Sequence, residues 1–458
     1  MTAKAPMPVR TLNLVAPLPH EGTAMRTTDT TAPVQVRSGA VSHLIGSGLR
    51  MGDVDSANAR STPLTTPGIR TSTTATRTPT TRSSRRSGAP SADSSFSFSA
   101  LVQAYLDCRH HKRNTASALA FEERLEANLC ALFDELVSGE YRPGRSICFV
   151  ITRPKPREVW AAEFRDRIVH HVLYNHIAAR FHAAFVAGSC ACIPGRGTLY
   201  GAKRLEADIR SVTQNWSRPA HYLKLDLANF FVAIPKDILF EQLAAKIDEP
   251  WWRWLAEVIL FHDPRENHEL RGRAELLARV PPHKSLFNAP PDTGLPIGNL
   301  SSQFFANVHL DALDQFCKHR IGARHYVRYV DDFILLHESP QWLAAAHDRI
   351  REFLPARLGA HLNPKKTILQ PIARGVDFVG QVIKPWRRTT RLRTLHTCIQ
   401  RLGSMPAEDL FESGNSCLGM ARQASHSHQE QVLIARVLRR RGHVVHGDLS
   451  KIYRSHHG

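Results

Sequence analysis

The segment His325-Tyr-Val-Arg-Tyr-Val-Asp-Asp-Phe-Ile-Leu-Leu-His337 places two adjacent acids between two arms rich in β-branched, aromatic and aliphatic residues. This pattern predicts a tight β-hairpin with Asp331 and Asp332 at its tip. Because apolar arms bury the strands, the two carboxylates need a compensating cation, and a divalent metal ion is the natural one. Taken alone, the dipeptide is more typical of an ordinary turn.

A further acid, Asp226, ends the strand-like run that begins at Tyr222. Magnesium prefers hard oxygen ligands and keeps waters and substrate phosphates, so two or three convergent carboxylates suffice for a two-ion site. In phosphoryl transfer such a site activates an attacking 3′ hydroxyl and stabilises the leaving pyrophosphate. The sequence spacing leaves open whether Asp226 meets the acids of the hairpin.

Two stretches, Tyr329-Val330-Asp331-Asp332 and Asp226 through Phe231, resemble the catalytic hairpin and the preceding metal-binding motif of the reverse transcriptase family. The likeness covers about residues 100–425 in the family's motif order. It implies an RNA-directed DNA polymerase with an α+β fold of right-hand architecture, made of fingers, palm and thumb. It also implies two Mg²⁺ ions, with Mn²⁺ as a substitute, held by Asp226, Asp331, Asp332 and the backbone carbonyl of Leu227.

The resemblance also implies residues that bind the incoming dNTP. Lys155 and Arg157 would hold the triphosphate, for which ammonium and guanidinium groups are suited. Phe231 would exclude a ribonucleotide 2′ hydroxyl, although packing in the palm is the alternative for one of Phe230 and Phe231. Lys366 would protonate the departing pyrophosphate, with a solvated basic turn as the alternative.

Other matches concern nucleic acid. The basic helical tail from about Arg391 resembles a thumb, which would follow a duplex backbone without reading bases. Arg165 and Arg167 are equally well explained as phosphate ligands or as partners in helix-face salt bridges. The remaining matches imply contacts to template or primer and comprise Arg196, Gly197, Gln303, Phe378 and Gly380.

Ile297 indicates a subgroup of reverse transcriptases. Most members of the family carry Gln at the matching position of the Gly294–Gln303 motif. The altered motif resembles the enzymes of diversity-generating retroelements. Those enzymes copy a template RNA into cDNA with frequent errors opposite adenine, together with a small basic accessory protein. An apolar side chain cannot offer the nucleotide the hydrogen bond that Gln offers, which lowers discrimination by about 1–3 kcal/mol. Alternatively, Ile297 fills the pocket and fidelity is ordinary.

Two features favour other readings. A long polar insertion at residues 261–291 and an unusual tail at residues 416–423 leave room for a reverse transcriptase of an antiviral defence system. A group II intron maturase is disfavoured, because no Cys and His cluster follows the thumb. A noncatalytic RNA-binding scaffold is the alternative from a different class, and the retention of all three acids argues against it.

The composition bounds these readings. Lys and Arg number 60 against 41 Asp and Glu, and the formal charge of +19 suits a polyanionic partner. A biased gene composition with a solvated surface is the alternative. The eight cysteines are scattered, so we expect reduced thiols in a cytoplasmic protein. No run of about 18 apolar residues occurs, which argues against membrane insertion.

The chain is expected to divide into four parts. Residues 1–97 are rich in Ser, Thr, Pro and Arg, which predicts a disordered tail, although Met25 and Met51 offer later starts. The fingers and the start of the palm would span residues 98–219, the palm residues 220–385, and the thumb with a basic tail residues 386–458. Periodicity predicts helices at 161–185, 199–212, 238–247, 302–317 and 341–358. It predicts strands at 146–152, 220–226, 325–331, 333–337 and 377–383.

Overall fold

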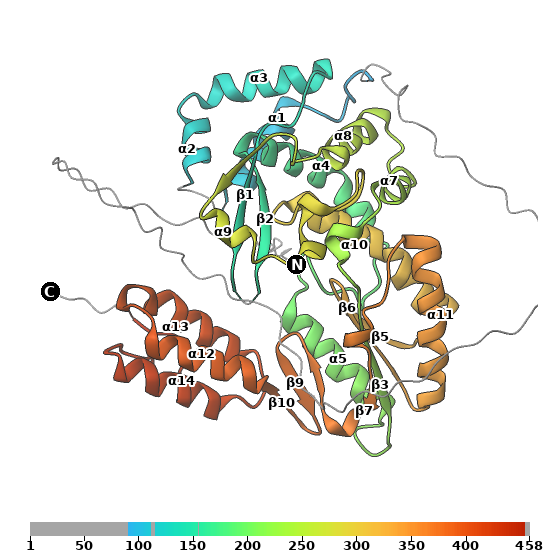
Figure 1. Ribbon diagram of the computed structural model, residues 1–458, viewed down its shortest axis with the longest axis vertical. Helices are drawn as coiled ribbons and strands as arrows, with labels where there is room; N and C mark the ends of the chain where they lie inside the picture. The colour runs from blue at the N-terminus through green and yellow to red at the C-terminus, as the bar shows by residue number, and fades with distance from the viewer. Residues whose placement is uncertain (1–89, 111–114, 154, 454–458) are drawn as a thin grey trace, which may run out of the picture.

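The computed structural model describes residues 90–110, 115–153 and 155–453, and it mixes helices with three small sheets (Figure 1). The helices are α1 (Phe98–Arg109), α2 (Ala116–Glu122), α3 (Leu125–Ser138), α4 (Phe164–His182), α5 (Thr198–Val212), α6 (Phe230–Ala233), α7 (Lys236–Ala244), α8 (Pro250–Phe261), α9 (Ala274–Leu277), α10 (Leu300–Gln315), α11 (Pro340–Leu358), α12 (Leu392–Ser404), α13 (Ala407–Arg422) and α14 (His428–Arg440). The strands are β1 (Ser146–Ile151), β2 (Arg157–Ala162), β3 (His221–Asp226), β4 (His268–Arg271), β5 (His325–Tyr329), β6 (Asp332–His337), β7 (Ile368–Pro371), β8 (Val376–Phe378), β9 (Gln381–Lys384) and β10 (Arg387–Thr390).

The central sheet has the strand order β5-β6-β3-β7, and all its pairs are antiparallel. Because successive side chains of a strand point to opposite faces, this sheet separates two cores. Leu223 and Leu225 of β3 pack in the larger core, whereas Tyr222 packs in the smaller one. Helix α11 covers one face and α5 the other (Figure 1). The alternation of β3 therefore fixes which face carries Lys224 and Asp226.

The second sheet extends from the β1–β2 hairpin. β1 pairs antiparallel with β2 and parallel with β4, which comes from the predicted insertion at 261–291. The third sheet has the order β10-β9-β8; β9 and β10 lie to the left of β3 and β7 in the view of Figure 1 and lead into the C-terminal helices.

The C-terminal helices α12, α13 and α14 pack around a core of their own, which includes Leu402, Leu418 and Leu438. Cys398 of α12 and Cys417 of α13 form a disulfide, with their Cα atoms 6.3 Å apart. The prediction of reduced cysteines is therefore wrong for this pair, because two neighbouring helices bring the residues together across a sequence gap. Six other cysteines among the described residues form no disulfide.

The predicted elements differ from the structure in particular places. The strand expected at 377–383 is two strands, β8 and β9, because the backbone turns at Val379 and Gly380, which both have positive φ. β2 begins before the helix expected at 161–185, and α8 was not predicted. β10 pairs with β9, so the boundary expected after residue 385 falls within a hairpin.

The predicted tail at residues 1–97 lies outside the described residues up to residue 89. Its last part contacts the folded chain. The Phe96 ring stacks on Trp251 with the ring centroids 4.6 Å apart, and the Trp252 indole donates to the Ser95 hydroxyl at 2.9 Å. The described chain is therefore already packed on the core before α1 begins.

A fully buried ion pair connects the central sheet to its surroundings. The Arg328 guanidinium of β5 donates to both carboxylate oxygens of Asp314 on α10, at 2.7 and 2.6 Å. It also donates to Asn307, to the Ser189 hydroxyl and to the carbonyl of Val330. One side chain thus links β5, α10, the chain before α5 and the turn after β5.

We predict that Arg328→Met destabilises the protein by about 3–5 kcal/mol, because it leaves the Asp314 carboxylate buried without its partner. The double variant Arg328→Met/Asp314→Leu should recover much of this loss. Urea denaturation measures both, with Arg351→Met at an exposed position as the control. If Arg328→Met lowers the free energy of unfolding no more than Arg351→Met does, the role assigned to the buried Arg328–Asp314 pair is wrong.

Candidate active site

The acids of the hairpin lie at a two-residue turn, as predicted. Tyr329 and Asp332 are the last paired residues of β5 and β6, and Val330 and Asp331 form the turn between them. Val330 has φ of 56°, a conformation that strains a β-branched residue by about 1–3 kcal/mol. Its carbonyl accepts a hydrogen bond from Arg328 at 3.0 Å, which helps to hold the turn in this conformation.

Asp226 meets this turn from β3. It lies directly opposite Asp332 in the antiparallel register, so both side chains share one face with Cβ atoms about 5 Å apart. The backbone N–H of Leu227 donates to the carbonyl of Asp331 at 3.2 Å, and the N–H of Asn363 donates to the carbonyl of Asp226 at 2.8 Å. Residues distant in the sequence therefore converge at one end of the central sheet.

The convergence of acids has an electrostatic cost. Burial, followed by the charge of Asp226, raises the pKa of Asp331 to about 6. Burial also raises the pKa of Asp332, although Lys224 opposes the shift. The Lys224 ammonium lies 3.0 Å from one oxygen of Asp332 and donates to the carbonyl of Asp377. The site thus holds more negative charge than its lysines neutralise.

Lys366 reaches the same acids from the loop after α11. It ends a short 3-10 helix, Pro364–Lys366, which Asn363 caps by accepting from the N–H of Lys365 at 3.2 Å. The Lys366 ammonium donates to Asp226 at 2.6 Å, and its side chain is 40% exposed. The lysine therefore lies beside the acids and remains accessible to a phosphate.

The donors suit a hard divalent cation. One oxygen of Asp332 is buried without a hydrogen-bond partner, and three carboxylates converge at strand ends. Yet within the described ranges no group of three or more His, Cys, Asp or Glu side chains is arranged as a metal cluster, and lysines pair with two of the acids. Two carboxylates with waters and substrate phosphates are sufficient for magnesium, so the residues fit such an ion once Lys366 turns from Asp226.

Backbone hydrogen bonds connect Phe231 and the segment that carries Ile297 to their neighbours. The carbonyl of Phe231 accepts from the N–H of Leu295 at 2.7 Å, and the carbonyl of Ile297 accepts from Trp160 at 2.7 Å. Gly298 has φ of +132°, and a Cβ there would lie 2.8 Å from the carbonyl oxygen of Trp160. Backbone contacts therefore fix Ile297, and its half-buried side chain remains free to vary.

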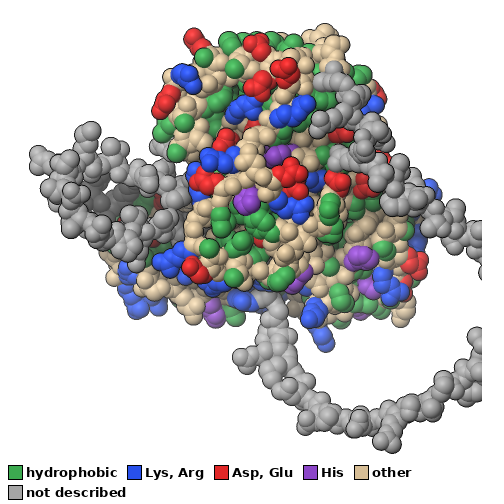
Figure 2. Space-filling view, turned by 45° about the horizontal axis from the view of Figure 1, so that its top comes forward, with side chains coloured by type: hydrophobic (Ala, Val, Ile, Leu, Met, Phe, Trp, Pro, Cys, Tyr) green, Lys and Arg blue, Asp and Glu red, His purple; other side chains and the backbone are tan. Residues whose placement is uncertain are grey.

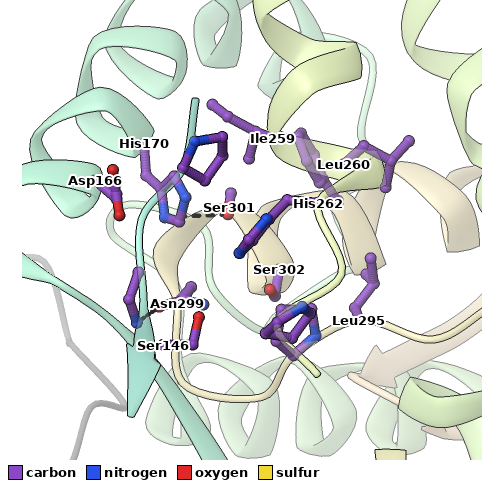
Figure 3. A pocket seen from close by; sticks show the side chains of 15 residues that line it. Ser146, Asp166, His170, Ile259, Leu260, His262, Leu295, Asn299, Ser301 and Ser302 are labelled. Atoms are coloured by element: carbon purple, nitrogen blue, oxygen red, sulfur yellow. Dashed lines mark hydrogen bonds between the residues drawn. The ribbon is translucent and has the colours of Figure 1, made fainter. Parts of the chain in front are cut away.

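Behind this segment lies a pocket between α4, α8 and the start of α10 (Figure 3). Its polar lining is engaged within the protein. The Asn299 side-chain oxygen accepts from the N–H of Ala162 at 3.1 Å, and Ser301 bonds to His170 at 3.4 Å. Asp166 accepts from the Tyr141 hydroxyl at 3.0 Å. These contacts hold the segment after Ile297 against β2 and α4.

The predicted triphosphate ligands flank the β1–β2 turn. Lys155 is exposed within the turn and Arg157 begins β2. Burial and the charges of neighbouring cations, Lys284 first, lower the pKa of Lys155. Arg165 instead pairs with Glu135 and Asp166, and buried Arg167 donates to the carbonyl of Ala162. Structural roles thus account for these two arginines.

The predicted template and primer residues lie mainly in structural positions. The Arg196 guanidinium donates to the carbonyls of Val186 and Ser189, both at 2.8 Å. Phe378 is fully buried in the smaller core, so its ring contacts protein alone. Gly380 forms the β8–β9 turn, and Gly197 is the N-cap of α5. Gln303 on α10 accepts from the Cys192 thiol at 3.4 Å.

Sequence reasoning missed two residues of the site. Lys224 lies two positions before Asp226 and hence on the same face of β3, a signal that the period of a strand contains. Arg328 precedes the acid pair by three positions, but nothing in the local pattern indicates that its guanidinium is buried under the turn.

Structural comparison found telomerases. Apo telomerase from Candida tropicalis, truncated from its C-terminal domain, has 13% identity and a TM-score of 0.41 over 54% of this chain and 55% of that one. Telomerase from Candida albicans with a TWJ fragment of telomeric RNA has 12% identity and a TM-score of 0.38 over 66% and 57%. The corresponding Candida tropicalis complex has 13% identity and a TM-score of 0.41 over 66% and 53%. The chain spans little more than half the length of each of these proteins.

No curated protein matches the sequence. Among the described residues, no helix is long and apolar enough to cross a membrane. Residues 154–383 match the family described as "Reverse transcriptase (RNA-dependent DNA polymerase)". That range includes all three acids, Lys366 and the Ile297 segment, and the mixed helix and strand fold confirms the predicted α+β class of right-hand polymerase architecture. The chain belongs to the reverse transcriptase family.

Proposed function

We propose that this protein is an RNA-directed DNA polymerase that copies a retroelement template RNA into cDNA and errs frequently at template adenines. The observation that carries the proposal is the meeting of Asp226, Asp331 and Asp332 at one strand end beside Lys366, in a chain of the reverse transcriptase family. Such a site suits nucleotidyl transfer from a dNTP to a primer hydroxyl.

Asp226, Asp331 and Asp332, with the backbone of Leu227, would hold two Mg²⁺ ions, for which Mn²⁺ would substitute. Bound ions supply charge neutralisation at the attacking and leaving oxygens. Phe231 would face the sugar, and Lys155 and Arg157 the triphosphate. Lys366 would exchange its bond to Asp226 for one to the departing pyrophosphate and donate a proton there.

Three parts of the chain would make up the right-hand architecture that binds nucleic acid. Residues 98–219 would form the fingers and the start of the palm, residues 220–385 the palm, and residues 386–458 the thumb with a basic tail. On the face shown in Figure 2, Lys and Arg are interspersed with Asp and Glu, so the basic excess does not form a uniform coat. We therefore propose that particular residues contact template and primer, and these include Arg196, Gly197, Gln303 and Gly380.

Ile297 supports the diversity-generating subtype, because it presents an apolar side chain on a backbone that is hydrogen-bonded to Trp160 of β2. A small basic accessory protein would then act with the enzyme. The second candidate is a reverse transcriptase of antiviral defence, which the segment at 261–291 favours. The genomic neighbourhood separates them, since paired repeats that differ at adenines support diversity generation and a lone noncoding RNA supports defence. Sequencing cDNA made on the co-expressed local RNA tests both.

We predict that Asp331→Asn or Asp226→Asn lowers Mg²⁺-dependent dNTP incorporation on a primed RNA by at least about a hundredfold. Chelation of divalent ions should do the same to the wild type. The pKa of Asp331 rises in the fold from 3.8 to about 6, so its ionisation destabilises the fold as pH rises through this interval. Asp331→Asn should therefore leave the melting temperature at neutral pH unchanged or higher.

Asp348→Asn, at an exposed position on α11, is the control and should retain full activity and stability. Near wild-type incorporation by Asp331→Asn or Asp226→Asn would refute the metal assignment. Loss of activity together with a lowered melting temperature would instead assign the acids to the fold.

Deletion of residues 1–89 should leave polymerisation and stability intact, because that composition lacks the apolar residues needed for a core. Deletion of residues 1–97 is the matched variant. It removes Phe96 from its stack on Trp251 and should lower the free energy of unfolding by about 3 kcal/mol. Activity assays at low and moderate salt, with urea denaturation, measure the two. An inactive 1–89 deletion would contradict the expectation.

Ile297→Gln should reduce misincorporation at template adenines selectively. One restored hydrogen bond of about 1.4 kcal/mol corresponds to about tenfold in error frequency. Ile297→Leu preserves an apolar side chain and should keep the adenine errors. Sequencing of cDNA made by each variant on its own template, with any accessory protein, provides the measurement. A wild type without adenine bias would sink the diversity-generating subtype and leave the polymerase proposal standing.

A further inference from the structure

The segment between α8 and Gly294 is attached to the β1–β2 hairpin at its predicted nucleotide-binding end. Glu158, the residue after Arg157, is buried, and its carboxylate accepts from the N–H of Leu286 at 2.9 Å. The same carboxylate oxygen accepts from the Trp160 indole at 3.2 Å. Trp160 also packs against Phe287 with the ring centroids 4.8 Å apart. The buried Glu158 therefore fixes the backbone of Leu286 to the β1–β2 hairpin. Glu158 is next in sequence to Arg157, a predicted triphosphate ligand.

The chain just before Leu286 is equally constrained. The N–H of Lys284 donates to the carbonyl of Pro281 at 2.8 Å, closing a turn that contains Pro282. From the other side, Arg265 donates to the carbonyls of Leu286 and Ala289, at 3.2 and 2.6 Å. The backbone of Lys284 is thus held in place by its neighbours, and its side chain is exposed.

Lys284 belongs to a group of cations drawn from separate parts of the chain. It exerts the largest electrostatic effect of any charged group on Lys155, ahead of Lys366, Arg157 and Arg393. Among the described residues, Lys155, Arg157, Lys284 and Arg393 form no ion pair with an acid. Like charges gathered without acid partners favour a polyanion, and Lys284 adds a cation whose chain is anchored to the β1–β2 hairpin through Leu286 and Glu158.

We propose that Lys284 is a phosphate-binding residue of the nucleotide site, supplied by the segment at 261–291, and that it contacts the triphosphate of the incoming dNTP together with Lys155 and Arg157. The proposal rests on the polymerase function and deepens it. Glu158 acts as a positioning residue, because it holds Leu286 next to the β1–β2 hairpin. The segment is in this way part of the active site.

A free triphosphate is favoured over the RNA backbone as the ligand. Lys284 stands with cations from the β1–β2 turn, the Lys366 loop and α12, which are separate parts of the chain and all act on Lys155. Compact groups of ammonium and guanidinium ions suit the clustered oxygens of a triphosphate. A strand of RNA spaces its charges along a path and is better matched by an extended row.

The test uses the full chain with Lys284→Ala, with Lys284→Arg, and with Arg273→Ala as the matched control. Arg273 is an exposed cation of the same segment, so its removal lowers the net charge equally. Steady-state kinetics give KM for dNTP and kcat. Calorimetry with inorganic tripolyphosphate gives the affinity for a chain of phosphates without activity, and binding of a labelled RNA gives the affinity for template.

Lys284→Ala should raise KM for dNTP and weaken tripolyphosphate binding about five- to tenfold, with kcat and RNA affinity nearly unchanged. Lys284→Arg should stay within about twofold of the wild type, and Arg273→Ala should match the wild type. Equal effects of Lys284→Ala and Arg273→Ala would overturn the proposal. Weakened RNA binding with an unchanged KM would overturn it too, by assigning Lys284 to the template.

The polymerase proposal fails separately. If Asp331→Asn incorporates dNTP as the wild type does, the proposed catalytic site is wrong. Tripolyphosphate binding still decides the role of Lys284 in that case, because it requires no turnover.

Discussion

The buried guanidinium of Arg328 is the interaction on which the active site depends. A charge removed from water must find partners for every donor, and Arg328 finds them in Asp314, Asn307, Ser189 and the carbonyl of Val330. The same Asp314 accepts from the Tyr326 hydroxyl at 2.6 Å. Because the partners come from α10, from the chain before α5 and from the turn after β5, a shift in any one of these parts leaves a buried polar group unsatisfied. The network therefore specifies one position for the turn that carries the acids.

Arg328 holds the turn between β5 and β6 in one position, and the acids at this turn repel one another. Burial and the charge of Asp226 raise the pKa of Asp331, and Val330 holds an unfavourable backbone angle, so the turn stores free energy at the site where a substrate with metal ions would bind. Lysines offset part of this charge from two sides, Lys224 within β3 and Lys366 from the loop after α11. Both lysines can release an acid without unfolding the sheet, since the strand register does not depend on them.

The sequence predicted the parts whose patterns are local. Runs of β-branched, aromatic and aliphatic residues located β3, β5 and β6, and the motif resemblance located the acids and Lys366, which the structure brings together. β2 escaped because it begins with two charged residues and ends with two alanines, which are depleted in strands. β4 escaped because it is short and three of its four residues are polar. The pair Cys398–Cys417 and the place of Lys284 arise from packing between distant segments, and no spacing in the chain encodes them.

β4 protects the edge of β1 against pairing with other chains. β1 is flanked by β2 on one side, and on the other it would present a row of unpaired backbone groups beside apolar residues such as Ile147 and Phe149. Such an edge is a template for pairing with another chain. The short, charged β4 covers it and leaves Glu269 and Arg271 at the new edge, where they discourage further strands. A variant that lacked the segment at 261–291 would expose the unpaired edge of β1. We therefore expect it to aggregate, in addition to any change in its activity.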